Sequence, residues 1–315
     1  MKKAYLFSLF LFLIFGYIPS TAQIIISELS LIGNVKSVKE TSFEAISVSG
    51  KISKGDKKRE IEGDFDYSIL FQENGLKIRE DLFLTKDNES YKLTLNYNEE
   101  GFLIQRIWYN LDGSINQKWN YTLNEKGNPV IAENQTINKS SKKHYTYDKR
   151  GNITEFSSYT SSDSLINKET YTYNYLDLIT EKNRFDSQKK LIYKLVFKYD
   201  KKGNKTESLR YLTNAKFLFE KFEYKYNQKN QKTEEFCYNT SKKLAYKKVF
   251  KYNQKGLIKK IEKHQNINEY NTSELKLIET KTYKYYFDKQ ENWIKKIVFL
   301  NEEPTFIFER EIEYF

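Results

Sequence analysis

The feature that most constrains this chain is a motif that recurs about every 26 residues from residue 67 to the end. Each copy places a large apolar or aromatic residue just before a short polar stretch. These residues are Phe71, Tyr97, Leu123, Tyr147, Tyr173, Tyr199, Tyr226, Tyr252 and Phe287, and a partial tenth copy ends at Tyr314. Successive copies lie 26, 26, 24, 26, 26, 27, 26 and 35 residues apart. Such self-similarity predicts a stacked array of one structural unit.

The polar stretch of each copy has the composition of a tight β-hairpin turn. In Tyr147-Asp-Lys-Arg-Gly151 the Asp side chain can bond the backbone two residues on, and the closing Gly supplies a positive φ. The structural turn positions are Gly75, Gly101, Gly127, Gly151, Gly203 and Gly256. Three copies replace the Gly with Asp177, Asn230 or Glu291. Asp and Asn tolerate left-handed geometry, whereas Glu291 predicts strain or a rearranged loop.

A second aromatic slot, eight residues after the Gly position, gives the register of the array. It is occupied by Phe83, Tyr109, Gln135, Tyr159, Phe185, Tyr211, Tyr238, His264 and Phe299. Before the turn, Tyr193, Leu195 and Phe197 alternate with polar Lys194 and Lys198, which is the period of a half-buried strand. A second turn separates the two strands of a copy, clearest at residues 110–113 and 213–215.

These patterns predict an all-β fold, a long curled antiparallel meander of about nine 26-residue β-hairpin repeats. Nine repeats give roughly eighteen strands. Open sheets of more than about ten strands rarely stay flat, because their twist accumulates until they curl or close. We expect the aromatic face to point inward.

Three segments divide the chain. Residues 1–22 have the pattern of a cleaved secretory signal, with Lys2 and Lys3 before an apolar run and small residues before Gln23. Residues 23–66 keep neither aromatic slot and are expected to form an N-terminal cap, which repeat arrays need at an open end; within them, residues 34–45 could instead be a partner for strand pairing. Residues 67–315 form the array. We expect a periplasmic, cell-surface or extracellular protein, with no transmembrane segment in its mature part.

The composition limits the possible partners. One cysteine, Cys237, excludes an intramolecular disulfide, so packing and hydrogen bonds must hold the fold. The formal charge of +11 is compatible with an anionic partner, although Lys and Glu that alternate on solvated strands also explain it. We expect a cell-surface glycan or another envelope protein as partner, and no nucleic acid. The oligomeric state stays open.

The unit Tyr145-Thr-Tyr-Asp-Lys-Arg-Gly-Asn152 and its counterpart at residues 197–204 resemble the YD repeat of the RHS family. The resemblance covers about residues 67–315. The whole arrangement is similar to that of secreted YD-repeat proteins of Bacteroidota. It implies a spiralling β-sheet shell and a surface role, in some members with carbohydrate binding. The chain is far shorter than the large RHS proteins and lacks their Asp-Pro-rich core segment and toxin domain, so the toxin function is not carried over.

Few residues suggest chemistry. His264 fills an aromatic slot and Cys237 lies beside a slot residue within a strand, so packing explains both. His144 is expected to face solvent. Glu155, Glu181, Glu207 and Glu234 recur four residues after the Gly position, as Lys/Glu pairing across strands would produce. We therefore predict no enzyme activity, no cofactor and no metal site.

The leading functional hypothesis is a non-catalytic binding module for a carbohydrate or protein ligand. Its candidate stacking residues are Tyr109, Tyr159, Tyr211 and Tyr238. They are core if the sheet curls tightly and a binding platform if it stays open. The alternatives are a structural or shell-like scaffold, whose end strands pair with other chains, and a hydrolase with a site in the insertion at residues 266–275. An outer-membrane barrel would need a continuous apolar outer band, which the Lys-rich strands do not provide.

Overall fold

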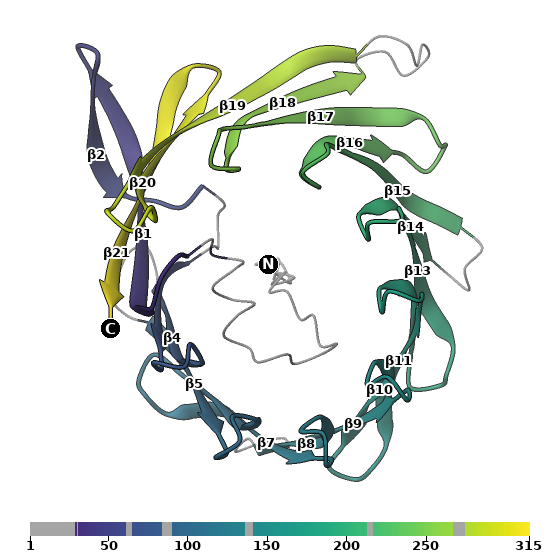
Figure 1. The fold of residues 1–315 in the computed structure, drawn as a ribbon. Helices are drawn as coiled ribbons and strands as arrows, with labels where there is room; N and C mark the ends of the chain where they lie inside the picture. The colour runs from purple at the N-terminus through teal and green to yellow at the C-terminus, as the bar shows by residue number, and fades with distance from the viewer. Residues whose placement is uncertain are drawn as a thin grey trace, which may run out of the picture.

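The computed structural model describes residues 29, 31–60, 65–83, 90–135, 141–212, 217–266 and 275–315. Within these ranges the chain is all-β, with antiparallel strands and no helix. The strands follow one another around a closed ring, seen along its axis in Figure 1. The predicted signal, residues 1–22, lies outside the described residues, as do residues 213–215 and 267–274.

The strands of the first half of the chain are β1 (Val35–Val48), β2 (Lys51–Lys57), β3 (Asp66–Phe71), β4 (Lys77–Phe83), β5 (Ser90–Tyr97), β6 (Leu103–Tyr109), β7 (Ile115–Leu123), β8 (Pro129–Gln135), β9 (Ser141–Tyr147) and β10 (Ile153–Thr160). Those of the second half are β11 (Leu165–Tyr173), β12 (Ile179–Phe185), β13 (Leu191–Tyr199), β14 (Lys205–Leu212), β15 (Phe217–Tyr226), β16 (Lys232–Tyr238), β17 (Leu244–Tyr252), β18 (Ile258–Asn266), β19 (Leu275–Phe287), β20 (Trp293–Leu300) and β21 (Glu303–Tyr314).

The sheet closes on itself through β1. From β3 to β21 each strand pairs with the next, which confirms the predicted antiparallel meander. β1 then pairs with β21 along Val35–Glu44 and with β3 along Ser37–Glu40, which closes a barrel of 20 strands. β2 pairs with the second half of β1 and stands outside this ring. Residues 35–48, within the region expected to cap an open end, are thus a strand of the wall.

One face of the sheet points into the ring. Residues 58–60 leave β2 toward the interior (Figure 1), where Glu60 pairs with Lys281 at 2.6 Å and Arg59 contacts Glu40 at 3.4 Å. The face that carries Glu40 and Lys281 is therefore the inner face. All four clusters of buried apolar side chains lie on it, because side chains converge on the concave side of a closed sheet.

The outer face carries ladders of ion pairs between neighbouring strands. Glu181 pairs with Lys194 at 2.5 Å, and Glu234 pairs with Lys225 and Lys247 at 2.8 and 2.5 Å. Glu155 and Glu207 have equivalent lysine partners. The expectation that the recurring glutamates are cross-strand partners of lysine is confirmed.

The turns share one backbone pattern. In the turn after β9, Asp148 N–H donates to the Asn152 carbonyl at 2.9 Å and Gly151 N–H donates to the Asp148 carbonyl at 3.1 Å. Gly151 has a φ of +94°. Glu291 has a φ of +67° and keeps the same two bonds, so its loop is not rearranged and a glutamate occupies the left-handed conformation.

Tyrosine hydroxyls tie the strand ends together on the rim that carries these turns. The Tyr199 hydroxyl, at the end of β13, donates to the Ile179 carbonyl at the start of β12, 2.7 Å away. The other donors are Tyr97, Tyr147, Tyr173, Tyr226, Tyr252 and Tyr285, each bonded to a carbonyl near the start of the preceding strand at 2.6 to 3.0 Å. The tyrosine before the turn therefore has a hydrogen-bonding role in addition to its packing.

A buried polar cluster lies on the inner face where β1 meets β3 and β21. Arg310 Nε lies 2.9 Å from a Glu40 carboxylate oxygen, and the Tyr67 hydroxyl donates to the same oxygen at 2.9 Å. Arg59 pairs with Asp66 at 2.9 Å. Buried charges are tolerated when they are paired and hydrogen-bonded, and these contacts join β1, β3 and β21 at the seam.

Candidate functional site

The four tyrosines proposed to stack on a ligand lie on the outer face. Tyr109, Tyr159, Tyr211 and Tyr238 end strands β6, β10, β14 and β16, and each is half-buried. Neighbouring side chains already contact three of them: Lys92 lies 4.7 Å from the Tyr109 ring centroid, His144 contacts Tyr159, and the Tyr238 hydroxyl donates to Glu223. Intervening strands separate the four rings, so they form a row around the barrel and no common site.

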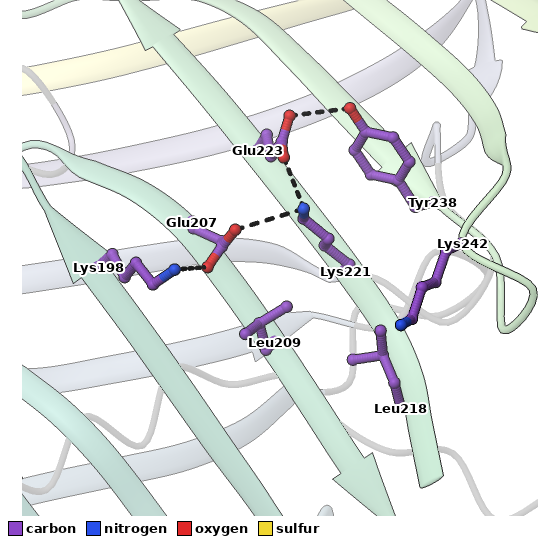
Figure 2. Close-up of a pocket in the computed structure, with 8 residues that line it drawn as sticks. All are labelled: Lys198, Glu207, Leu209, Leu218, Lys221, Glu223, Tyr238 and Lys242. Atoms are coloured by element: carbon purple, nitrogen blue, oxygen red, sulfur yellow. Dashed lines mark hydrogen bonds and ion pairs between the residues drawn. The ribbon is translucent and has the colours of Figure 1, made fainter.

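One of them, Tyr238, borders a pocket of about 330 Å³ on the outer face of β13 to β16 (Figure 2). Its lining comprises Lys198, Glu207, Leu209, Leu218, Lys221, Glu223, Tyr238 and Lys242. Lys221 lies between the two carboxylates, 3.4 Å from Glu207 and 2.7 Å from Glu223. Both glutamates are thus already neutralised by lysine.

The electrostatics of this pocket favour ion pairing over acid–base chemistry. The hydrogen bond from Lys221 lowers the pKa of Glu223, and the same contact raises the pKa of Lys221. A glycosidase acid needs the opposite, a carboxyl group kept protonated near neutral pH. The pocket therefore offers a ring, two leucines and ionised pairs, which suit contact with a polar ligand.

The cysteine and the two histidines remain separate. Cys237 lies half-buried on the inner face of β16, and burial raises the pKa of its thiol, which disfavours the thiolate nucleophile. His144 is exposed on β9, and His264 is half-buried on β18. Among the described residues, no three His, Cys, Asp or Glu side chains gather as metal ligands would.

The inner wall has a different chemistry, in which cations lie against aromatic rings. Lys143 Nζ is 4.0 Å from the Trp119 ring centroid, and the Arg310 guanidinium is 3.6 Å from that of Trp293. Similar contacts join Lys232 to Phe250 and Arg210 to Tyr193. Cations held over rings leave ring edges and N–H groups able to meet sugars or anions.

Part of this wall remains accessible to solvent. Arg184 and Lys248 lie on the inner face, and their side chains are 40% and 35% exposed. Sequence reasoning placed the candidate ligand contacts in the second aromatic slot and missed the inner cations. One available signal was that two of the three tryptophans, Trp108 and Trp119, are only 11 residues apart.

The fold defines an all-β antiparallel barrel, and comparisons add little to that description. No family model and no curated protein matches the chain. A porin-like protein from Bacteroides uniformis is 12% identical, with 90% of this chain and 98% of that chain covered and a TM-score of 0.36. One from Bacteroides vulgatus is 12% identical over 75% and 97% of the two chains, with a TM-score of 0.32.

The Tc holotoxin pore of Photorhabdus luminescens is 10% identical, with 77% of this chain and 19% of that chain covered and a TM-score of 0.25. Similarity this low assigns no activity. Separately, no helix within the described ranges has the length and apolar character of a membrane span.

Proposed function

We propose that this chain is an exported, non-catalytic binding protein of the cell envelope or extracellular space, whose inner wall holds a carbohydrate ligand. The observation that carries the proposal is the inner wall itself, where cations lie against aromatic rings on several strands while Arg184 and Lys248 stay accessible. Saccharides are bound by such surfaces because apolar ring faces stack on aromatics while hydroxyls meet charged and polar groups.

We propose further that the wall is assembled from about nine hairpin repeats of the YD type. The recurring turn bonds and the tyrosine hydroxyl bonds at one rim support this view. The outer ladders of Lys and Glu suit an aqueous surrounding, because a lipid-facing wall needs an apolar band. The barrel is then a shell in water with its binding chemistry inside.

The test is a screen of the purified chain against immobilised neutral and acidic oligosaccharides, followed by calorimetric titration of the hits. We expect saturable binding that Tyr193→Ala on the inner wall weakens and that Tyr238→Ala in the outer pocket leaves unchanged. Absence of saccharide binding would overturn the proposal. Loss of binding in the Tyr238→Ala variant alone would move the site to the outer face.

A second candidate function, a structural scaffold that assembles through strand edges, has one feature in its favour. Both ends of the meander, β3 and β21, pair with β1, whereas β2 pairs with β1 alone among the described strands. An open strand edge is a template for another chain. Light scattering after size exclusion tests this: a monomer at all concentrations would eliminate assembly through β2.

A further inference from the structure

Four side chains on neighbouring strands form a compact group on the inner wall. Arg106 of β6 lies opposite Trp119 of β7, and Trp119 lies opposite Asn134 of β8. Lys143 of β9 lies opposite Ala132, the buried small residue two positions before Asn134. Because the Ala132 side chain is small, Lys143 extends across β8 until its Nζ is 4.0 Å from the Trp119 ring centroid.

Two polar atoms of this group have unmet hydrogen-bonding capacity. Asn134 is 7% exposed, and its Oδ1 accepts no hydrogen bond from the described residues. The Arg106 Nε–H is also buried and donates to no described acceptor. A buried polar group without a partner is costly, so natural structures retain one mainly where something else supplies the partner. Here the missing partners are an acceptor for Arg106 and a donor for Asn134.

The charge around these atoms favours an anion. The inner-face strand positions from β6 to β12 hold four cations, Arg106, Lys143, Lys182 and Arg184, and one carboxylate, Glu169. Glu169 is already engaged by Lys182 at 2.9 Å and Arg184 at 3.4 Å. Burial, and secondarily the charge of Arg106, lowers the pKa of Lys143 to about 8, although the charge of Glu169 acts in the opposite direction. A bound anion would relieve the repulsion between Arg106 and Lys143.

We infer that this group is a subsite for a carboxylate-bearing saccharide, a uronate unit. Its carboxylate accepts from the Arg106 Nε–H and faces Lys143, a ring hydroxyl donates to Asn134 Oδ1, and its apolar edge packs beside Trp119. A simple anion would leave Asn134 unsatisfied, and a neutral sugar would leave Arg106 without a charged acceptor. The inference rests on the proposed saccharide-binding function and gives that function a ligand class and a position.

The experiment titrates the purified chain with an oligogalacturonate and with a neutral oligosaccharide of equal length. Tryptophan fluorescence and calorimetry provide the readouts, since Trp108 and Trp119 lie at the subsite and only Trp293 lies elsewhere. We expect tighter binding of the uronate, weakened about tenfold or more by Arg106→Gln, the usual effect of losing a charge-assisted hydrogen bond. Asn134→Ala should weaken binding of the uronate severalfold.

Lys225→Gln is the matched control, because it removes a cation from the outer face, where the side chain is 65% exposed; its Kd should change less than twofold. Asn134→Ala removes no hydrogen bond of the Oδ1 atom and should unfold at a urea midpoint close to that of the parent chain. Arg106→Gln also loses a hydrogen bond to Tyr121 and the contact with the Trp108 ring, so its Kd is measured at urea-free conditions where its unfolding curve shows a folded chain. Equal affinity for both saccharides, or an unchanged Kd in Arg106→Gln, overturns this inference and leaves the proposed function standing. If no saccharide binds at all, the proposed function fails first.

Discussion

At the scale of the residue, the turn position with a positive φ keeps the same backbone conformation whether or not glycine occupies it. The position is filled by Gly203 and Gly256, but Lys189, Lys242 and Glu291 occupy it at φ values of 63°, 59° and 67°. A side chain with a Cβ pays a steric cost of about 1 kcal/mol for this conformation. Strand pairing on both sides of each turn imposes the backbone conformation, and the residue at this position adopts it despite the steric cost.

Lys189→Gly should therefore stabilise the barrel. Lys189 is exposed and closes the turn between β12 and β13 through its N–H, which donates to the Asp186 carbonyl and is kept by glycine. We expect the free energy of unfolding in urea to rise by about 0.5 to 1 kcal/mol. Gly113→Ala is the reverse control, because Gly113 has a φ of +82° and a Cβ there meets no atom within 4 Å; it should lower the stability by a similar amount. A lower stability for Lys189→Gly would mean that the lysine is not strained.

At the scale of the element, each strand is fixed to its neighbour by more than its ladder. The tyrosine hydroxyl bonds span 18 to 27 residues and join the ends of consecutive strands at one rim. Turn side chains add links between neighbouring turns, as where Asn152 Nδ2 donates to Asp177 Oδ1 at 2.7 Å. These contacts limit fraying of that rim, where the ladder ends.

Tyr199→Phe should expose the contribution of one such bond. The substitution keeps the ring and removes the donor to the Ile179 carbonyl, so we expect a loss of about 1 kcal/mol in the free energy of unfolding. Tyr211→Phe is the control, because its hydroxyl makes no hydrogen bond with the described residues. Faster amide exchange at the β12–β13 rim in Tyr199→Phe alone would support the assignment. Equal effects of the two changes would refute it.

Strands and turns could be predicted from the sequence because the residues that specify them lie within a few positions of each other. Turn residues and alternating aromatics specify strands a few residues away. The lysine–glutamate ladders follow because the glutamates recur at a fixed spacing from each turn. The inner subsite was not predictable, because Arg106, Asn134 and Lys143 occupy different positions in their copies of the motif. Only strand register brings them together.

At the scale of the whole molecule, closure depends on a strand that lacks the motif. β1 lacks the recurring turn motif, so the sequence predicted a cap for its region, with residues 34–45 as an alternative partner for strand pairing. It becomes a wall strand because Val38 and Glu40 match Ile312 and Arg310 across a separation that no local pattern reveals. Closure also pairs the edges of the two end strands. In an open sheet such unpaired edges can pair with other chains and cause aggregation.

Glu40→Gln should weaken this seam in a pH-dependent way. Burial alone would raise the pKa of Glu40, but the charges of Arg310 and Lys296 and the hydrogen bonds from Arg310 and Tyr67 outweigh it and lower the pKa below 4.5. Its stabilising contribution is therefore fully present above pH 4.5 and is lost as the pH falls through the lowered value. We expect Glu40→Gln to cost about 3 kcal/mol at pH 7 and much less at pH 3.

The measurement is urea unfolding of both chains at the two pH values. Glu311→Gln is the control on the outer face of β21, where the side chain is 78% exposed and lies 4.0 Å from Lys39. An exposed ion pair of this kind contributes little to stability, so its loss should hardly change the free energy of unfolding at either pH. A constant difference between Glu40→Gln and the parent chain at both pH values would contradict the assignment of the effect to the Glu40 charge.

The contact between Glu40 and Arg310 joins residues 270 positions apart, and this has a consequence for biosynthesis. Strand β1, which closes the wall, is synthesised before the other wall strands, and its partner β21 is synthesised after them. Pairing across so long a separation is slow, since the entropy of ordering the whole chain must be met before the seam contributes. Until β21 is available to pair with β1, the wall strands can form only an open sheet with unpaired edges, and such edges expose the chain to aggregation.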